Sequence, residues 1–182
     1  MDMPLAGLET LLRRLGAVDA GAWAAVTGSM RSARYGIERP IRLEAGGLLY
    51  VGEGLLKQYV RHGRTQPAIN RFIRQGEVYA VPHDPDPVYI KTIQPSTVYC
   101  WDSHTLRRLL LEYPSLLGSY LKIRDMQENA LDTRLWLLEQ TGKAKLALFD
   151  RTFGQLRAHL KGKDLGNYLH LAYAYISQIR EK

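Results

Sequence analysis

Residues 48–60, LLYVGEGLLKQYV, hold two apolar runs separated by a turn rich in glycine. Leu, Val and Tyr in short runs favour strands, and Gly52-Glu53-Gly54 supplies the turn between them. Further β-rich runs follow at 68–73, 78–81, 88–93 and 97–101, with turn signals such as Gln75-Gly76 and the proline-rich segment 82–87 between them. Several short strands at turn spacings of about 8–12 residues are typical of a sandwich or barrel. The region 31–101 is therefore predicted to form a small β-roll.

Helical patterns flank this region on both sides. Before it, leucines recur at helical spacing at positions 5, 8, 11, 12 and 15, and residues 18–26 favour a second short helix. After it, Asp102 or Ser103 can cap a helix that runs to about Glu112. Pro114 suits the first turn of a longer helix, which we expect to end at Thr141-Gly142. The predicted fold class is α+β.

The long predicted helix, residues 115–140, carries two apolar stripes. One stripe is Leu117, Leu121, Leu131, Leu135 and Leu138, and the other is Leu116, Tyr120, Ile123, Ala130 and Leu137. A helix with two apolar faces can cover its own domain and also pair with a partner helix. Burial between two layers of one chain would give the same pattern. We favour homodimerisation.

The composition is that of a globular protein of one or two domains. The chain has 182 residues, 46% of them hydrophobic, and its 25 basic and 18 acidic residues give a formal charge of +7. Cys100, the single cysteine, excludes an internal disulfide framework and any multi-Cys metal centre, and it fits a reducing compartment. No apolar run approaches the roughly 20 residues of a membrane span, and the N-terminus lacks the order of a signal peptide. We expect a soluble cytoplasmic protein without a membrane partner.

The positive charge is concentrated in the C-terminal segment. Residues 141–182 hold eight basic and three acidic residues, a balance of +5. Such a segment attracts phosphate backbones or anionic lipid. A solvated basic surface is the alternative explanation.

The last twenty residues have the apolar spacing of a helix-turn-helix. Leu165 and Leu169 lie four apart on a first helix, Leu171 falls in the turn, and Ile176 and Ile179 lie three apart on a second helix. Gly166 would let the two helices approach closely, although a plain αα-hairpin would show the same spacing. In a helix-turn-helix the second helix enters the DNA major groove. We expect phosphate contacts from Lys161, Lys163 and Lys182, and base-edge contacts from Tyr173, Tyr175, Ser177, Gln178 and Arg180.

Residues 164–180 resemble the helix-turn-helix of Crp/Fnr transcriptional regulators. Four more segments, 48–59, 72–78, 89–98 and 111–116, are similar to successive elements of that family in the same order. The resemblance implies a cyclic-nucleotide-binding-like β-roll with N-terminal helices (1–113), a dimerisation helix (114–141) and a helix-turn-helix domain (142–182). His170 replaces the family's turn glycine, and Gln178 replaces the arginine that reads a guanine. A ligand sensor or protein-interaction scaffold without DNA recognition is therefore kept as the alternative function.

The resemblance also implies an effector site in the β-roll. In nucleotide-binding members, Gly-Glu starts a phosphate-binding cassette, and a later arginine pairs with the cyclic phosphate. Gly76-Glu77 is present, but no arginine occurs from 78 to 90. We predict that cyclic AMP and cyclic GMP do not bind in the standard way. Arg71 or Arg74 could compensate from a neighbouring strand for this or another small effector.

A β-roll also resembles the metal-binding cupin barrel, which makes an enzyme an alternative function. His62 and His83 fall in turns, with Asp84 and Asp86 near the second, but no His-x-His pair exists. Turn histidines on the surface are the favoured explanation. No nucleophile elbow or Gly-rich phosphate loop is present, and Cys100 beside Trp101 is expected to be a buried core thiol. We expect no catalytic residues, metal or cofactor.

Overall fold

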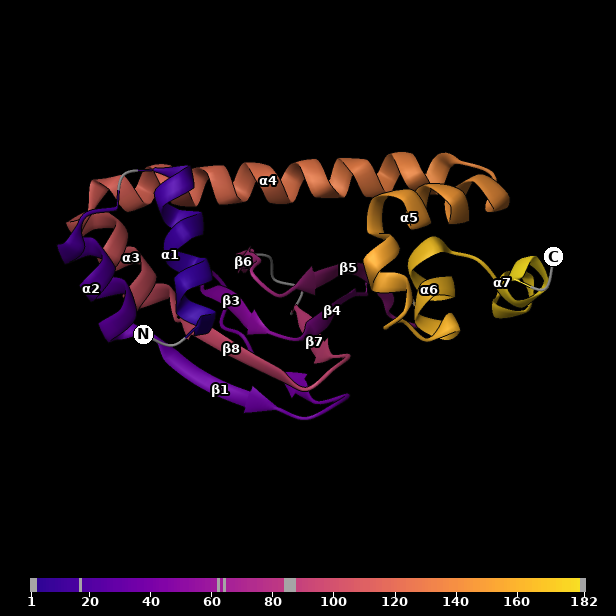
Figure 1. The fold of residues 1–182 in the computed structure, drawn as a ribbon, viewed down its shortest axis with the longest axis horizontal. Helices are drawn as coiled ribbons and strands as arrows, with labels where there is room; N and C mark the ends of the chain where they lie inside the picture. Colours follow the sequence, from indigo (N-terminus) through magenta and orange to yellow (C-terminus); the bar gives the residue numbers. More distant parts are fainter. Residues whose placement is uncertain (1–2, 17, 62, 64, 84–87, 181–182) are drawn as a thin grey trace.

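The computed structural model describes the backbone of residues 3–16, 18–61, 63, 65–83 and 88–180. A β-roll lies at the centre, with helices at both ends and one long helix running across it (Figure 1). The helices are α1 (Met3–Leu15), α2 (Ala20–Ser29), α3 (Ser103–Glu112), α4 (Pro114–Glu139), α5 (Gly142–Arg157), α6 (Gly162–Leu169) and α7 (Tyr173–Arg180). The strands are β1 (Arg31–Tyr35), β2 (Pro40–Ile41), β3 (Leu48–Glu53), β4 (Leu55–Val60), β5 (Ala68–Arg74), β6 (Val78–Ala80), β7 (Tyr89–Thr92) and β8 (Ser96–Trp101).

The β-roll consists of two antiparallel sheets packed face to face. One sheet has the strand order β1-β8-β3-β6 and the other β2-β7-β4-β5. Strand alternation sends one side chain in two toward the opposite sheet, where apolar residues from both sheets form a core. That core contains Ile41, Leu49, Val51, Leu56, Ile73, Tyr79, Val81, Ile90 and Val98. The β-region is where the sequence predicts it and its strand pairs are antiparallel, and the structure adds β1 and β2, for which the sequence carried no strand signal.

The helices at the N-terminal end close one side of the β-roll. Apolar faces of α1, α2, α3 and the first half of α4 pack together with Trp101, whose indole N–H donates to the Val26 carbonyl at 2.9 Å. Asp102 caps α3 by accepting from the Thr105 N–H at 2.8 Å. Pro114 occupies the first turn of α4, where its missing N–H costs nothing. Each of these helix starts agrees with its sequence signal.

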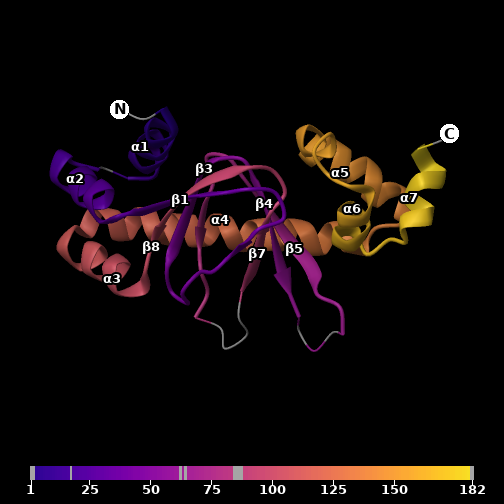
Figure 2. The ribbon, with the colours of Figure 1, turned by 90° about the horizontal axis from the view of Figure 1, so that it is seen from below.

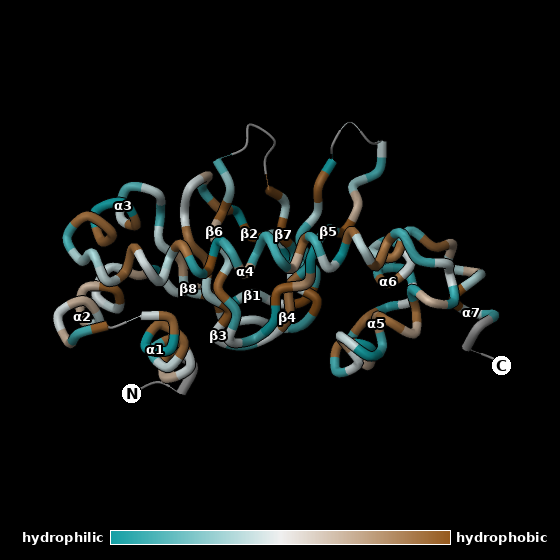
Figure 3. The backbone as a smooth tube through the Cα atoms, turned by 90° about the horizontal axis from the view of Figure 1, so that it is seen from above, coloured by the Kyte–Doolittle hydropathy of each residue, from teal (hydrophilic) through white to brown (hydrophobic). Residues whose placement is uncertain are grey.

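Helix α4 connects the two ends of the molecule. It passes across the β-roll, with α1, α2 and α3 near its start and α5, α6 and α7 near its end (Figures 2 and 3). The Gln127 side chain fixes it to β6, because its amide accepts from the Ala80 N–H at 2.6 Å and donates to the Ala80 carbonyl at 3.1 Å. Helix α4 ends at Glu139, and Gly142 begins α5 instead of ending α4.

The C-terminal helices share a core with the β-roll. Leu55, Ile69, Phe72 and Ile93 of the β-roll contact an apolar cluster from α4 to α7 that includes Phe149, Leu165, Tyr168, Leu169 and Ile176. The predicted boundaries at 113/114 and 141/142 fall at element ends, yet the packing is continuous across the second one. None of the helices among the described residues combines the length and apolar character that a membrane crossing requires.

Candidate nucleic-acid interface and effector cavity

Helices α6 and α7 are joined by a tight turn. His170 ends α6 with a left-handed backbone (φ 54°), and the Leu171 N–H returns to the Gly166 carbonyl at 2.9 Å. A Cβ on Gly166 would lie 2.7 Å from the Leu171 carbonyl oxygen, so only glycine fits there. Ile176 of α7 is buried against the same cluster as Leu165. Gly166 and Ile176 therefore lie where α6 and α7 pack together.

The predicted DNA-contacting residues lie along α6, its approach and α7. Lys161 and Lys163 are exposed, as is Gln178, while Ser177 is half-buried. Lys161 lies 4.0 Å from Glu38, a contact at the limit of an ion pair. Arg180 lies in α7, but its side chain and the whole of Lys182 are outside the described residues.

Two tyrosines of α7 rest on glycines at the starts of other helices. The Tyr173 ring occupies the space beside Gly162, where a Cβ would lie 2.5 Å from it, and the Tyr175 ring lies similarly beside Gly142. Tyr173 remains 61% exposed and Tyr175 37%. Each ring therefore contacts a glycine of a neighbouring helix and is also partly exposed to solvent. The glycines that begin α5 and α6 were the sequence signal for this packing.

Helix α6 is attached to the edge strand β5. The Asn167 side chain accepts from the Ile69 N–H and donates to the Pro67 carbonyl at 3.2 Å. From α4, the Arg134 guanidinium donates to the Ile69 carbonyl at 3.0 Å and lies 5.1 Å from the centre of the Tyr168 ring. Edge strands expose unpaired backbone groups, and these two side chains satisfy several of them. Neither residue is among those predicted from the sequence.

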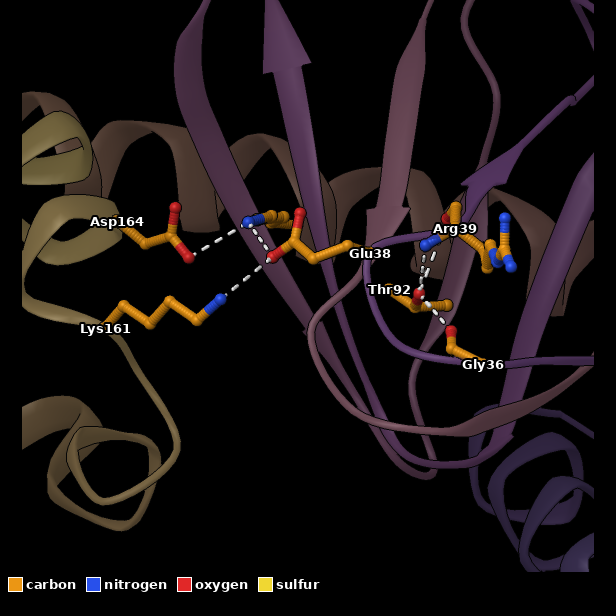
Figure 4. A network of polar contacts seen from close by, with 7 residues as sticks. Gly36, Glu38, Arg39, Thr92, Lys161 and Asp164 are labelled. Carbon is orange, nitrogen blue, oxygen red and sulfur yellow. Dashed lines mark hydrogen bonds and ion pairs between the residues drawn. The ribbon is translucent and has the colours of Figure 1, made fainter.

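A buried ion-pair network joins β4 to α6 (Figure 4). The Lys57 ammonium lies 2.7 Å from the Glu38 carboxylate and 3.0 Å from the Asp164 carboxylate, and the lysine side chain is only 3% exposed. Burial alone would lower the pKa of Lys57, but hydrogen bonds to the two carboxylates outweigh it and hold the pKa above its ordinary value. The sequence signal for this network is a lysine within the mainly apolar run of β4, LLKQYV.

The outer face of α4 is apolar and exposed. Leu117, Leu121, Leu131 and Leu135 are between 39% and 58% exposed. Of the opposite stripe, Leu116, Ile123 and Leu137 are buried and Tyr120 is half-buried, whereas Ala130 is exposed, so the predicted separation of the two stripes holds for four of its five members. We call the exposed set, completed by Arg124, Glu128 and the half-buried Leu138, the α4 seam. Arg124 and Glu128 lie 3.8 Å apart within it.

The four predicted effector residues line one cavity. Gly76 and Glu77 form the turn between β5 and β6, where Gly76 has φ +81°, and Arg71 and Arg74 lie on β5. The cavity has a volume of about 310 Å³, is partly open to solvent and is also lined by residues of α1 and α4. It lies outside the apolar core between the two sheets. The Glu77 carboxylate accepts from Arg74 Nε at 2.7 Å, so its partner is a side chain of its own hairpin.

An enzyme of this fold would need a cluster of metal-binding side chains or a reactive thiol. Within the part of the chain that the structure describes, no three His, Cys, Asp or Glu side chains gather as a metal site. His62, Asp84 and Asp86 lie outside the described residues. Cys100 is half-buried, where full burial was expected, and burial raises the pKa of its thiol to about 11. That thiol stays protonated near neutral pH and is a poor nucleophile.

Comparison with solved structures places this fold among Crp/Fnr transcriptional regulators. FixK2 from Bradyrhizobium japonicum matches with a TM-score of 0.67 and 15% identity, over 82% of this chain and 81% of its own. A putative Crp/Fnr regulator from Eubacterium rectale matches with a TM-score of 0.72 and 8% identity, over 88% and 81%. The c-di-GMP responsive regulator CLP from Xanthomonas campestris matches with a TM-score of 0.69 and 13% identity, over 90% of each chain.

No family model and no curated protein matches the sequence. At these identities the structural likeness shows the fold alone: a two-sheet β-roll followed by helices.

Proposed function

We propose that this protein is a homodimeric, DNA-binding transcriptional regulator of the Crp/Fnr type that acts in the cytoplasm and is not an enzyme. The observation that carries the proposal is the α6-turn-α7 unit, in which Tyr173 and Gln178 of the second helix and Lys161 and Lys163 at the start of the first are exposed. Exposed polar and aromatic groups on one helix, with lysines beside them, suit base edges and phosphates respectively.

The proposed dimer forms through the α4 seam, with a second copy of this chain as the partner. Positions 117, 121, 124, 128, 131, 135 and 138 alternate in steps of four and three, which is the a/d repeat of a two-stranded coiled coil. Five of the seven are leucines, and exposed leucines in such a line are costly in water. Arg124 and Glu128 occupy its middle, where charged groups of opposite sign can fix the register between two copies.

The dimer would place two α7 helices in adjacent major grooves. Half-sites of a symmetric operator are then about 34 Å apart, one turn of the double helix. Lys161 and Lys163 would contact phosphates, and Tyr173, Tyr175, Ser177, Gln178 and Arg180 would approach base edges. Contacts to phosphate position the protein, while those to bases select the sequence.

Selection of genomic fragments with the purified protein at two salt concentrations tests the proposal. We expect enrichment of a two-fold symmetric sequence that survives the higher salt. Gln178→Ala should relax the selected sequence at particular positions, whereas Lys163→Ala should weaken binding to all sequences and reduce its salt dependence. Lys91→Ala, on the exposed face of β7, is the matched control for the loss of a lysine. Weak, sequence-independent binding that vanishes at higher salt would contradict the proposal.

One observation favours the alternative of a ligand sensor or interaction scaffold that does not read DNA. The rings of Tyr173 and Tyr175 already pack on Gly162 and Gly142, and Gln178 stands in place of a guanine-reading arginine. In that case the selection would fail, yet the dimer and the cavity would persist. Chemical cross-linking would then detect the dimer, and ligand titration would detect binding in the cavity, although no operator sequence is recognised.

A further inference from the structure

The cavity between α1, the β5–β6 turn and α4 has an excess of positive charge. Arg14, Arg71 and Arg74 line it together with one carboxylate, that of Glu77, so three cations minus one anion leave a formal charge of +2. Arg74 and Glu77 are joined by an ion pair within the hairpin and neutralise each other. The excess therefore resides on Arg14 and Arg71, which reach the cavity from α1 and β5.

Arg71 is the residue that most requires an anion. Its guanidinium lies 5.9 Å from the centre of the Tyr79 ring, and among the described residues it makes no ion pair or hydrogen bond. Burial lowers the pKa of Arg71, with the nearby Glu77 charge acting in the opposite direction. A guanidinium that loses water without gaining an anionic partner is held at a cost, which a bound anion would remove.

The remaining lining is mostly apolar. Leu11, Val78, Ile123, Met126 and Ala130 face the cavity, while the Gln127 amide is already bonded to Ala80. A volume of about 310 Å³ lies at the lower end of the range for small-molecule sites. A ligand that fills this space would have a charged head near the arginines and an apolar group against α4.

We propose that this cavity binds a small dianion that carries an apolar group, with its charged head on Arg71 and Arg14. The planar guanidinium fork pairs with phosphate and with carboxylate, so an aryl phosphate and an aromatic dicarboxylate share the required chemistry. Because Ile123 and Met126 belong to α4, the ligand would contact the same helix that carries the seam. Any effect on DNA binding rests on the proposed function, whereas the binding itself does not.

Isothermal titration of the full chain without DNA tests this site. The probes are phenyl phosphate and phthalate, with inorganic phosphate and benzyl alcohol as the head-only and apolar-only controls. We expect saturable binding of at least one dianion, tighter by about tenfold or more than either control. Preference for phenyl phosphate would assign a phosphoryl head, and preference for phthalate a carboxylate head. No saturable heat with either dianion up to about 10 mM would overturn the proposal.

Variants locate the binding within the molecule. Arg71→Met keeps the aliphatic stem and should weaken binding by about tenfold or more, while Arg108→Met, on the exposed face of α3, should leave it unchanged. If Arg71→Met does not fold, Arg14→Ala provides the same test. Arg14 lies on the exposed side of α1, so its removal disturbs few packing contacts. Equal affinity of the wild type and both cavity variants would place the dianion elsewhere. Since DNA is absent, failure of operator recognition would leave these results standing.

Discussion

The Asp164→Ala substitution should loosen the attachment of α6 to the β-roll. It removes the carboxylate 3.0 Å from the Lys57 ammonium and leaves that buried cation with Glu38, whose side chain is 39% exposed. Removal of one partner from a buried pair costs about 3–5 kcal/mol. Because Glu38 still neutralises part of the charge, we expect the free energy of unfolding to fall by about 2–3 kcal/mol.

Removal of both charges should be much less harmful. In the Lys57→Met, Asp164→Leu double variant no buried charge is left between β4 and α6, and Glu38 keeps solvent and the nearby Lys161. Replacing a buried ion pair by apolar groups is often neutral, so we expect a change within about 1 kcal/mol of the wild type. Adding the single variants Lys57→Met and Asp164→Leu completes a double-mutant cycle, for which we expect a large coupling energy.

Equilibrium urea unfolding, followed by tryptophan fluorescence, to which the buried Trp101 contributes, measures these differences. The matched control is Lys91→Met, since Lys91 pairs with Lys57 across the sheet but is exposed. A surface change of that kind should stay within about 0.5 kcal/mol. The reasoning is refuted if Asp164→Ala costs no more than this control, or if the double variant is as unstable as Asp164→Ala.

Three further predictions concern separate parts of the molecule. Asn167→Ala should lower the free energy of unfolding in urea by about 1–3 kcal/mol, because it leaves the Ile69 N–H and the Pro67 carbonyl without their side-chain partner. An equal decrease for Asn129→Ala, at an exposed position, would contradict this. Leu135→Glu should convert a dimer to a monomer, as measured by light scattering, whereas Asn129→Glu on another face of α4 should leave the dimer intact. If both variants remain dimers, the interface lies elsewhere. Burial raises the pKa of the Cys100 thiol to about 11, so at pH 8 it should react with a disulfide reagent far more slowly in the native protein than in urea. The thiol ionises in the unfolded chain at lower pH than in the folded one, so its contribution to stability should fall as the pH rises toward 11, and a rise in stability over that range would contradict the assignment.

The main elements of the fold could be predicted because each carries a local signal. The strands from β3 to β8 are apolar runs between turn residues, and α3 and α4 begin at a capping aspartate and a proline. Strands β1 and β2 could not be found in this way. The segment Arg31–Tyr35 has little apolar pattern and pairs with β8 through its backbone, while β2 has only two residues. Their strand character comes from tertiary pairing.

The candidate site was only partly accessible to sequence reasoning. The α6-turn-α7 unit follows from the spacing of Leu165, Leu169 and Ile176 within one short segment. The ion-pair network does not, since Glu38, Lys57 and Asp164 are distant in sequence and meet only when α6 packs on the sheet. Arg14 joins the cavity for the same reason, because the position of α1 against the β-roll is set by the shared core.

The attachment of α6 to β5 also covers a sheet edge at which strands of other chains could pair. Strand β5, with the sequence AINRFIR, is hydrogen-bonded to β4 on one side only, and Asn167 and Arg134 occupy backbone groups on its other side. If α6 moved away, an apolar strand edge would become a template for β-pairing with other molecules. A chain cut after residue 141 would lose Asn167 altogether. We therefore expect the C-terminal helices to limit aggregation by keeping this strand edge covered.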